Sequence, residues 1–141
     1  MTLLRNNPDG LHATPGYHHV TVAPAGRTAY LAGQCPLDAA GHLVGPDDFE
    51  RQADQVAANA LVALRSVGAG PEHVVRTVIY VATADREVLA AVWQRFNASA
   101  LAEAFTTAST LLGVAQLGFP GQLVELDVTA ALPEQAPGQP S

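Results

Sequence analysis

Lysine is absent from this sequence, and charged residues of either sign are scarce. All seven basic residues are arginines, and they stand against 13 acidic residues, which gives a net charge of −6. Without lysine the chain cannot form a Schiff base on a side-chain amine. An acidic chain with no cluster of basic residues also cannot displace counterions from a duplex, so nucleic acid is not an expected partner.

The sequence is equally short of cysteine and of long apolar runs. Cys35 is the single cysteine, so no internal disulfide can form, and we expect a reducing compartment. No segment approaches the roughly 18 consecutive apolar residues that a membrane span needs. Residues 1–8 also lack the pattern of a signal peptide. These features predict a cytoplasmic protein with no membrane partner.

The shortage of charge predicts an oligomer. Hydrophobic residues make up 48% of the 141 residues and charged residues only 14%, whereas a typical soluble domain has about 25% charged residues. The chain is long enough to form one domain with its own core. It has too few charged side chains to cover a monomer, and an interface between identical subunits would bury the surplus apolar surface. The alternative is a monomer with a surface rich in alanine and glycine.

Alternation of apolar and polar residues predicts a single α/β domain over residues 17–132. The predicted strands cover residues 17–23, 28–34, 74–82, 109–114 and 122–131, with a short ribbon after the second strand. One helix is predicted to begin at Asp47, with Glu50 completing a capping box, and a second near residues 83–85. Residues 1–16 are turn-rich, so we expect a partly flexible segment. The Pro- and Gln-rich residues 133–141 predict a disordered tail.

Each predicted helix has one apolar face, so both are expected on one side of one sheet. The other sheet face is also expected to be apolar, because the strand residues Val20, Val22, Leu31, Val124 and Leu126 cannot all face the helices. No further helix is available to cover that face. A partner subunit is therefore the predicted cover.

Five short motifs along the chain resemble, in their order and spacing, the Rid/YjgF family of reactive intermediate deaminases. They are Pro15-Gly16-Tyr17, Leu31-Ala32-Gly33-Gln34-Cys35-Pro36, Gln52 with Asn59, Val78-Ile79-Tyr80-Val81, and Val124-Glu125-Leu126-Asp127. The resemblance implies a chorismate-mutase-like α/β fold, in which a mixed sheet carries two helices on one face. It also implies a homotrimer with a central barrel and ligand clefts between subunits.

In the deaminase branch, these clefts hydrolyse small imine and enamine intermediates to keto acids and ammonia without a cofactor or a metal. Carried over to this sequence, Glu125 matches the acid that orients the attacking water. Tyr17 and Gly33 match pocket residues, and Ala32 stands where a serine often precedes the glycine.

The family arginine that holds the substrate carboxylate has no counterpart. It precedes a Ser/Thr pair, which is Ser109-Thr110 here, so its place is taken by Ala108, or by Ser109 if the alignment shifts by one residue. No arginine or lysine follows Arg95. Alanine cannot replace the planar fork of a guanidinium. The ordinary keto-acid imine reaction therefore does not follow from the resemblance, although Arg76 or Arg27 of a neighbouring subunit could substitute.

Each candidate residue also has a structural interpretation. Glu125 should face away from Val124 and Leu126 by the two-residue period of a strand, with Asp127 on the same side. The adjacent histidines His18 and His19 should point to opposite faces, so they cannot hold one metal together. Cys35 is expected to be a small buried hydrophobe, because nothing near it in sequence would lower its pKa.

The sequence thus predicts a Rid-like homotrimer acting on small imine, enamine or carbonyl metabolites in inter-subunit clefts. Its candidate catalytic residue is Glu125, with ligand contacts from Tyr17, Ala32, Gly33, Ala108, Ser109 and Thr110. The alternative is a trimer that binds or senses a small ligand without catalysis. A ribonuclease activity fits badly with the net charge of −6.

Overall fold

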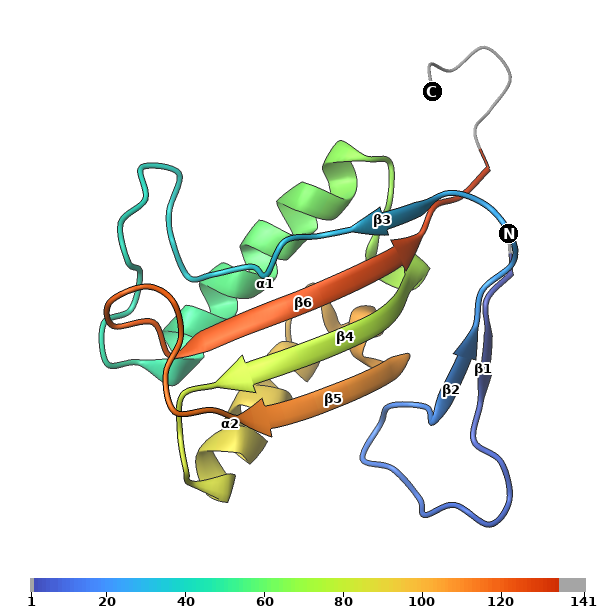
Figure 1. Ribbon diagram of the computed structural model, residues 1–141, viewed down its shortest axis with the longest axis horizontal. Coiled ribbons are helices and arrows are strands. Elements are labelled where there is room, and N and C mark those ends of the chain that lie inside the picture. Colours follow the sequence, from blue (N-terminus) through green and yellow to red (C-terminus); the bar gives the residue numbers. More distant parts are fainter. Residues whose placement is uncertain (1, 135–141) are drawn as a thin grey trace.

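The computed structural model describes residues 2–134 and centres on one mixed four-stranded sheet (Figure 1). The strands lie in the order β3-β6-β4-β5, with bounds β3 Thr28–Tyr30, β4 Val74–Val81, β5 Ala108–Gly113 and β6 Val124–Ala131. β6 is antiparallel to both of its neighbours, and β4 and β5 are parallel. The parallel pair requires a crossover, and helix α2 provides it.

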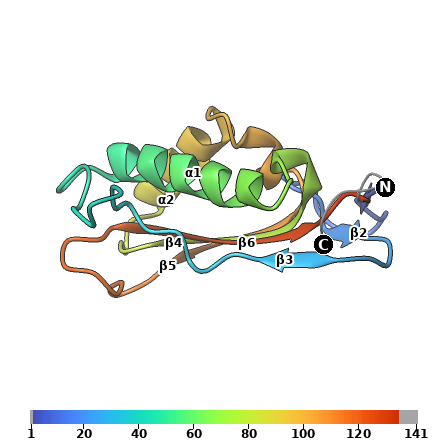
Figure 2. The same cartoon turned by 90° about the horizontal axis from the view of Figure 1, so that it is seen from above.

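Both long helices, α1 Phe49–Ser66 and α2 Arg86–Asn97, lie on one face of this sheet (Figure 2). They pack on the buried members of β4 and β6, where every second side chain points inward. Two short 3-10 helices, Pro71–His73 and Ala102–Phe105, complete this layer. The prediction of a mixed sheet with two helices on one face is confirmed.

The start of α1 differs from the prediction by one residue. Asp48 caps the helix, and its carboxylate accepts a hydrogen bond of 3.0 Å from the Arg51 amide. Asp47 precedes the cap and has a positive φ of 60°. Glu50 forms an ion pair with Arg95 at 3.7 Å and does not complete a capping box. The helix ends as predicted at Gly68, whose φ of 76° suits glycine.

The N-terminal part contains a strand that the sequence did not predict. β1 Leu4–Asn6 pairs with β2 Val20–Val22 in a separate two-stranded sheet, so the predicted strand over residues 17–23 is shorter than expected. The second predicted strand keeps its course along β6 beyond the end of β3, because the Gln34 amide and carbonyl both bond to Leu126, at 2.8 and 3.1 Å.

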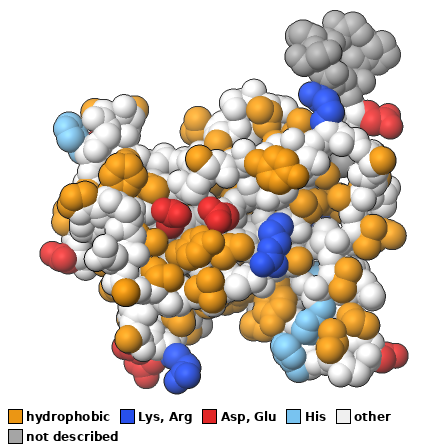
Figure 3. Space-filling view, in the orientation of Figure 1, with side chains coloured by type: hydrophobic (Ala, Val, Ile, Leu, Met, Phe, Trp, Pro, Cys, Tyr) orange, Lys and Arg blue, Asp and Glu red, His pale blue; other side chains and the backbone are white. Residues whose placement is uncertain are grey.

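The sheet face opposite the helices is open and carries both charged and apolar groups. Val124 and Leu126 face the helices and are fully buried, while Val20 and Val22 belong to the small sheet, so the predicted composition of this face was wrong. The open face carries the alternate side chains of the strands, namely Tyr30, Arg76, Val78, Tyr80, Thr110, Leu112, Glu125 and Asp127. Figure 3 shows acidic side chains set among apolar ones on this face, with a basic side chain beside them.

Within residues 2–134, no helix combines the length and the apolar character that crossing a bilayer would require.

Candidate functional site

The carboxylate of Glu125 is held by two polar side chains next to the strand segment that follows β3. Gln122, which is 4% exposed, donates from its amide nitrogen to Glu125 Oε1 at 3.2 Å, and the Cys35 thiol donates to the same oxygen at 3.5 Å. The side-chain oxygen of Gln122 in turn accepts from the Phe119 amide at 3.1 Å. Glu125 is therefore fixed through Oε1, while Oε2 points toward Gly33. We call Gly33, Cys35, Gln122 and Glu125 the carboxylate cluster.

Gly33 is required at this point by the close approach of Glu125. A Cβ atom on residue 33 would lie 2.5 Å from Glu125 Oε2 and 3.2 Å from Asp127 Oδ1. Neither distance leaves room for a methyl group, so any side chain at this position would push both carboxylates aside. Because residue 33 has no side chain, Oε2 of Glu125 can lie close against its backbone.

The thiol of Cys35 is protonated at neutral pH. Burial, followed by the negative charge of Glu125 and the hydrogen bond to it, raises the pKa of Cys35 from 9.0 to about 11. The thiolate is the nucleophilic form of cysteine, so Cys35 is not an activated nucleophile. It acts as a weak hydrogen-bond donor to Glu125.

Asp127 lies on the same face as Glu125 and has a different partner. The hydroxyl of Tyr80 donates to Asp127 Oδ2 at 3.1 Å. This hydrogen bond contributes most to raising the pKa of Tyr80. The two carboxylates thus have separate partners on the open sheet face, as the two-residue period of β6 predicts.

Two side-chain amides of α1 anchor the backbone that carries the carboxylate cluster. Asn59 donates to the carbonyls of Cys35 and Leu37, both at 2.9 Å. Gln52 is fully buried, and its oxygen accepts from the Leu123 amide at 2.7 Å, just before β6. These amides explain why Gln52 and Asn59 belong to the family pattern: they fix the segments that position Gly33 and Glu125.

A second feature is a hollow of about 640 Å³ between α2 and the edge strand β5. It is lined by Pro15, Tyr17, Arg86, Leu89, Ala90, Trp93, Gln94, Ser109, Thr110 and Leu111. The rings of Tyr17 and Trp93 meet edge to face with centroids 6.2 Å apart, and Trp93 packs in the same way on Phe105 at 5.9 Å. We call this the aromatic hollow.

The hydroxyl groups that were predicted to contact a ligand are already bonded within the chain. Ser109 accepts from the Thr77 hydroxyl at 2.6 Å and donates to the Thr107 carbonyl at 3.1 Å. Thr110 accepts from Arg76 at 2.9 Å. Both residues line the aromatic hollow, but their hydroxyls mainly hold β5 to its surroundings.

The two alanines of the predicted site lie away from the aromatic hollow. Ala108 is paired with Arg76 of β4, and it is not among the residues that line the hollow. Ala32 precedes Gly33, and its carbonyl accepts from the Gln34 side chain at 2.8 Å. Ala108 therefore joins neither group, and Ala32 lies next to the carboxylate cluster.

The carboxylate cluster and the aromatic hollow lie apart within one chain. The cluster sits where β6 meets the extension of β3, the hollow lies at β5, and β4 separates β6 from β5. No residue of the cluster lines the hollow. The predicted site residues thus form two groups in different places.

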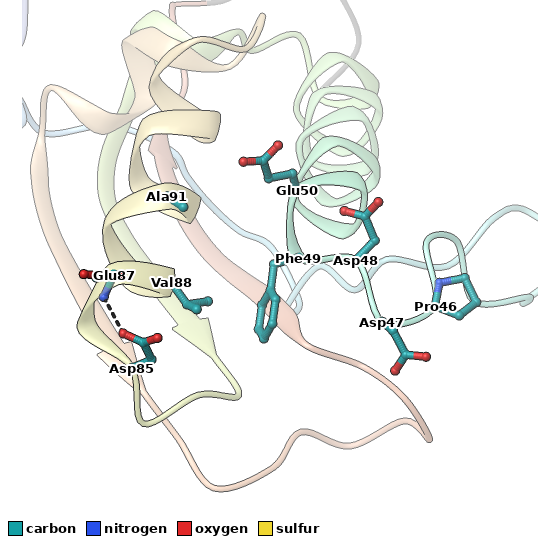
Figure 4. Close-up of a pocket in the computed structure, with 9 residues that line it drawn as sticks. All are labelled: Pro46, Asp47, Asp48, Phe49, Glu50, Asp85, Glu87, Val88 and Ala91. Carbon is teal, nitrogen blue, oxygen red and sulfur yellow. Dashed lines mark hydrogen bonds between the residues drawn. The ribbon is translucent and has the colours of Figure 1, made fainter.

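A third hollow, between the starts of α1 and α2, is lined by five acidic residues (Figure 4). Asp48 and Asp85 are the caps of the two helices, and Asp85 accepts from the Glu87 amide at 2.8 Å. Carboxylates at helix starts stabilise the helix dipoles. Among residues 2–134, no group of three or more His, Cys, Asp or Glu side chains could hold a metal ion.

The adjacent histidines bond in different directions. His18 contacts the Thr106 carbonyl through Nδ1, and His19 contacts the His12 carbonyl through Nε2 at 2.9 Å. They help to attach the N-terminal segment, in which the Tyr17 hydroxyl lies 3.2 Å from His12 Nε2.

Sequence reasoning missed three residues at these sites. Gln122 and Arg86 belong to none of the family motifs. Trp93 was predicted only as a core residue of its helix; it packs against the core, but it also lines the aromatic hollow. One signal was available for Arg86 and Trp93: they are seven residues apart on one predicted helix, so they share a face with Leu89. Gln122 gave no such signal, because it lies in a turn.

Comparison with known proteins places the chain in a family. Residues 8–132 match the family described as Endoribonuclease L-PSP. The Rid-family protein YyfB of Yersinia pestis has 33% identity and a TM-score of 0.82, covering 94% of this chain and 100% of its own. RidA of the Antarctic bacterium Psychrobacter has 25% identity and a TM-score of 0.61, covering 86% and 92%. The search of curated proteins gave no match.

The fold and the sequence together define an α/β protein of the L-PSP type. The chain belongs to the Rid/YjgF family, as its motifs indicated.

Proposed function

We propose that this protein is a homotrimer whose inter-subunit clefts hydrolyse small imine or enamine metabolites, with Glu125 as the catalytic residue. The supporting observation is the fixed carboxylate: Gln122 and Cys35 hold Oε1, and Oε2 lies beside Gly33. A carboxylate held in this way can orient a water molecule without changing its own rotamer.

The reaction needs one water molecule and no redox partner. The water oxygen adds to the imine carbon while Glu125 accepts a proton from it. Glu125 returns this proton to the nitrogen, which gives a carbinolamine. Glu125 then moves the hydroxyl proton of the carbinolamine to the same nitrogen while the carbon–nitrogen bond breaks, and a carbonyl compound and ammonia or an amine leave. An enamine is first protonated on carbon to give the same imine.

The separation of the two groups within one chain supports an inter-subunit cleft. Tyr17 and Trp93 in the aromatic hollow supply apolar contact area, and the carboxylate cluster supplies the base, yet they lie at different strands of one sheet. In a closed ring of three subunits, the hollow of one chain can face the cluster of the next. The open sheet face supplies apolar surface for this assembly, including Tyr30, which is 80% exposed.

The test is imine hydrolysis in a coupled assay. An amine oxidase supplies neutral imines and an amino-acid oxidase supplies carboxylate-bearing ones, and the loss of imine is followed with and without the protein. Glu125→Gln should lose at least about 100-fold in rate, because it removes the general base. Glu103→Gln, an exposed change in a 3-10 helix, should keep the rate. Equal rates for the natural protein, Glu125→Gln and buffer, with both classes of imine, would refute the proposal.

A ligand-binding trimer without catalysis is the second candidate. The bonded hydroxyls of Ser109 and Thr110 favour it, because they leave the aromatic hollow with few polar groups for a reacting ligand. Saturable binding without turnover in the same assay would support this function.

A further inference from the structure

We propose that Arg86 is the anion-binding residue of the aromatic hollow, and that the hollow takes an acid whose carboxylate is joined to a flat apolar body. This inference rests on the proposed function in treating the hollow as the ligand-binding part of the cleft. It names the class of ligand. It also assigns the binding of the ligand's carboxylate to Arg86 on α2, in place of the family arginine that is missing from β5.

The charge distribution around α2 carries the first step. On the side that faces α1, the groove is lined by acids that include Asp85 and Glu87. On the side that faces β5, Arg86 is the only charged residue among those lining the hollow. In a chain with a net charge of −6, a hollow with one cation and no acid selects for anions.

Arg86 is also unused by the rest of the chain. Within residues 2–134 its guanidinium takes part in no ion pair, whereas Arg95 on the same helix is bound by Asp54 at 2.8 Å and Glu50 at 3.7 Å. Arg76 donates to Thr110 at 2.9 Å. The fork of Arg86 can therefore make two hydrogen bonds to a carboxylate without breaking an existing contact.

The helix geometry fixes the shape of the ligand. Arg86, Leu89 and Trp93 lie on one face of α2 at spacings of three and four residues, so the backbone positions of Arg86 and Trp93 are about 10 Å apart along the axis. The wall between them is apolar, and Tyr17 closes it at right angles to Trp93. A flat ring can pack on these two side chains while an acid on a short chain reaches Arg86.

The test uses Trp93 as its own reporter, because it is the only tryptophan in the sequence. The probes are 3-phenylpropionate and its neutral counterpart 3-phenylpropanamide, titrated against the full-length protein while tryptophan emission is recorded. The acid should bind at least about tenfold more tightly than the amide, and the difference should shrink with added salt. Arg86→Gln should remove the difference, and Arg86→Lys should restore part of it.

Arg65→Gln is the matched control, because it removes the same charge from the last turn of α1, outside the hollow. Equal binding of acid and amide by the natural protein, or an unchanged preference in Arg86→Gln, would overturn the inference. A third result would also overturn it: Arg86→Gln dissociates the oligomer, but the protein that remains assembled still binds the acid more tightly than the amide. Arg86 would then be a contact between subunits and not a ligand-binding residue. Binding of the acid without imine turnover would leave this inference standing while the proposed function fails, and the reverse result would reject only this inference.

Discussion

Glu125 makes the Cys35 thiol harder to deprotonate, and Cys35 in turn donates a hydrogen bond to Glu125. The thiol donates to the carboxylate at 3.5 Å, while burial and the negative charge of Glu125 oppose loss of the thiol proton. The catalytic candidate is therefore next to a protonated thiol that cannot compete for an electrophilic ligand at neutral pH.

The reactivity of Cys35 tests this arrangement. A pKa of about 11 instead of 9.0 leaves roughly 100-fold less thiolate at pH 8, so alkylation by iodoacetamide should be about 100-fold slower than for an ordinary cysteine. The rate should rise as the pH approaches 11, because the thiolate then forms. Glu125→Gln should speed alkylation by removing the negative charge, and Asp127→Asn, which removes a carboxylate not in contact with the thiol, should change it little. Alkylation at the ordinary rate at pH 8 would contradict this account.

At the residue scale, the sequence predicted the direction of Glu125 and could not predict its environment. The two-residue period of β6 required Glu125 to oppose Val124 and Leu126, and the structure confirms it. The hydrogen bond from Gln122 depends on how the turn before β6 folds back, and the raised pKa of Cys35 depends on a contact 90 residues away. Periodicity carries no information on either.

At the scale of the element, β5 places the two positions that could correspond to the missing family arginine in different surroundings. Ser109 lines the aromatic hollow, whereas Ala108 pairs with Arg76 and lies outside that lining. The sequence left both positions open as the place of the missing arginine, and of the two only Ser109 lines the hollow that contains Tyr17 and Trp93.

An arginine introduced on β5 should act only at position 109. Ser109→Arg should give the protein affinity for pyruvate, because the new guanidinium enters the hollow and binds the carboxylate through two hydrogen bonds. Ala108→Arg adds the same charge beside Arg76, where the two cations repel, and should bind pyruvate no better than the natural protein. Isothermal titration calorimetry at low salt measures both. Pyruvate affinity in Ala108→Arg and none in Ser109→Arg would reverse the assignment.

The helices were easier to predict than the N-terminal strands. The apolar stripe predicted for α1 is fully buried at Ala53, Val56, Ala60 and Leu64, partly buried at Phe49 and 44% exposed at Val67. The helix ends before Gly68, as predicted. By contrast, β1 and β2 are three residues each and pair only with one another. Strands of three residues are too short to show the alternation of apolar and polar residues, so their pairing could not be predicted from the sequence.

At the scale of the whole molecule, the open sheet face leaves apolar side chains such as Tyr30 and Leu112 exposed in a chain with only 14% charged residues. Val78 lies on that face, because its neighbours Thr77 and Ile79 point to the helix side, and it is paired with Thr110 and Asp127 of the adjacent strands. A partner subunit on this face would cover it and leave the helices outside.

If the open sheet face is the interface of the proposed trimer, a charge placed on it should dissociate the subunits. Light scattering should give the natural protein three times the 14.6 kDa of one chain, and Val78→Asp a single chain, because a carboxylate cannot be buried there without a partner. Val62→Asp is the matched control: Val62 is 68% exposed on α1, so the trimer should persist. A natural protein that is monomeric at micromolar concentration would refute the assembly.

The separation of the carboxylate cluster from the aromatic hollow also has a genetic consequence. If each cleft takes its cluster from one chain and its hollow from the next, a chain with Glu125→Gln and a chain with Arg86→Gln damage opposite halves of the same cleft. With carboxylate-bearing imines as substrate, co-expression of the two chains should restore the natural activity in about a quarter of the clefts, those in which both intact halves meet. Two defective alleles of this gene would then complement one another inside a single assembly, which separate monomers cannot do.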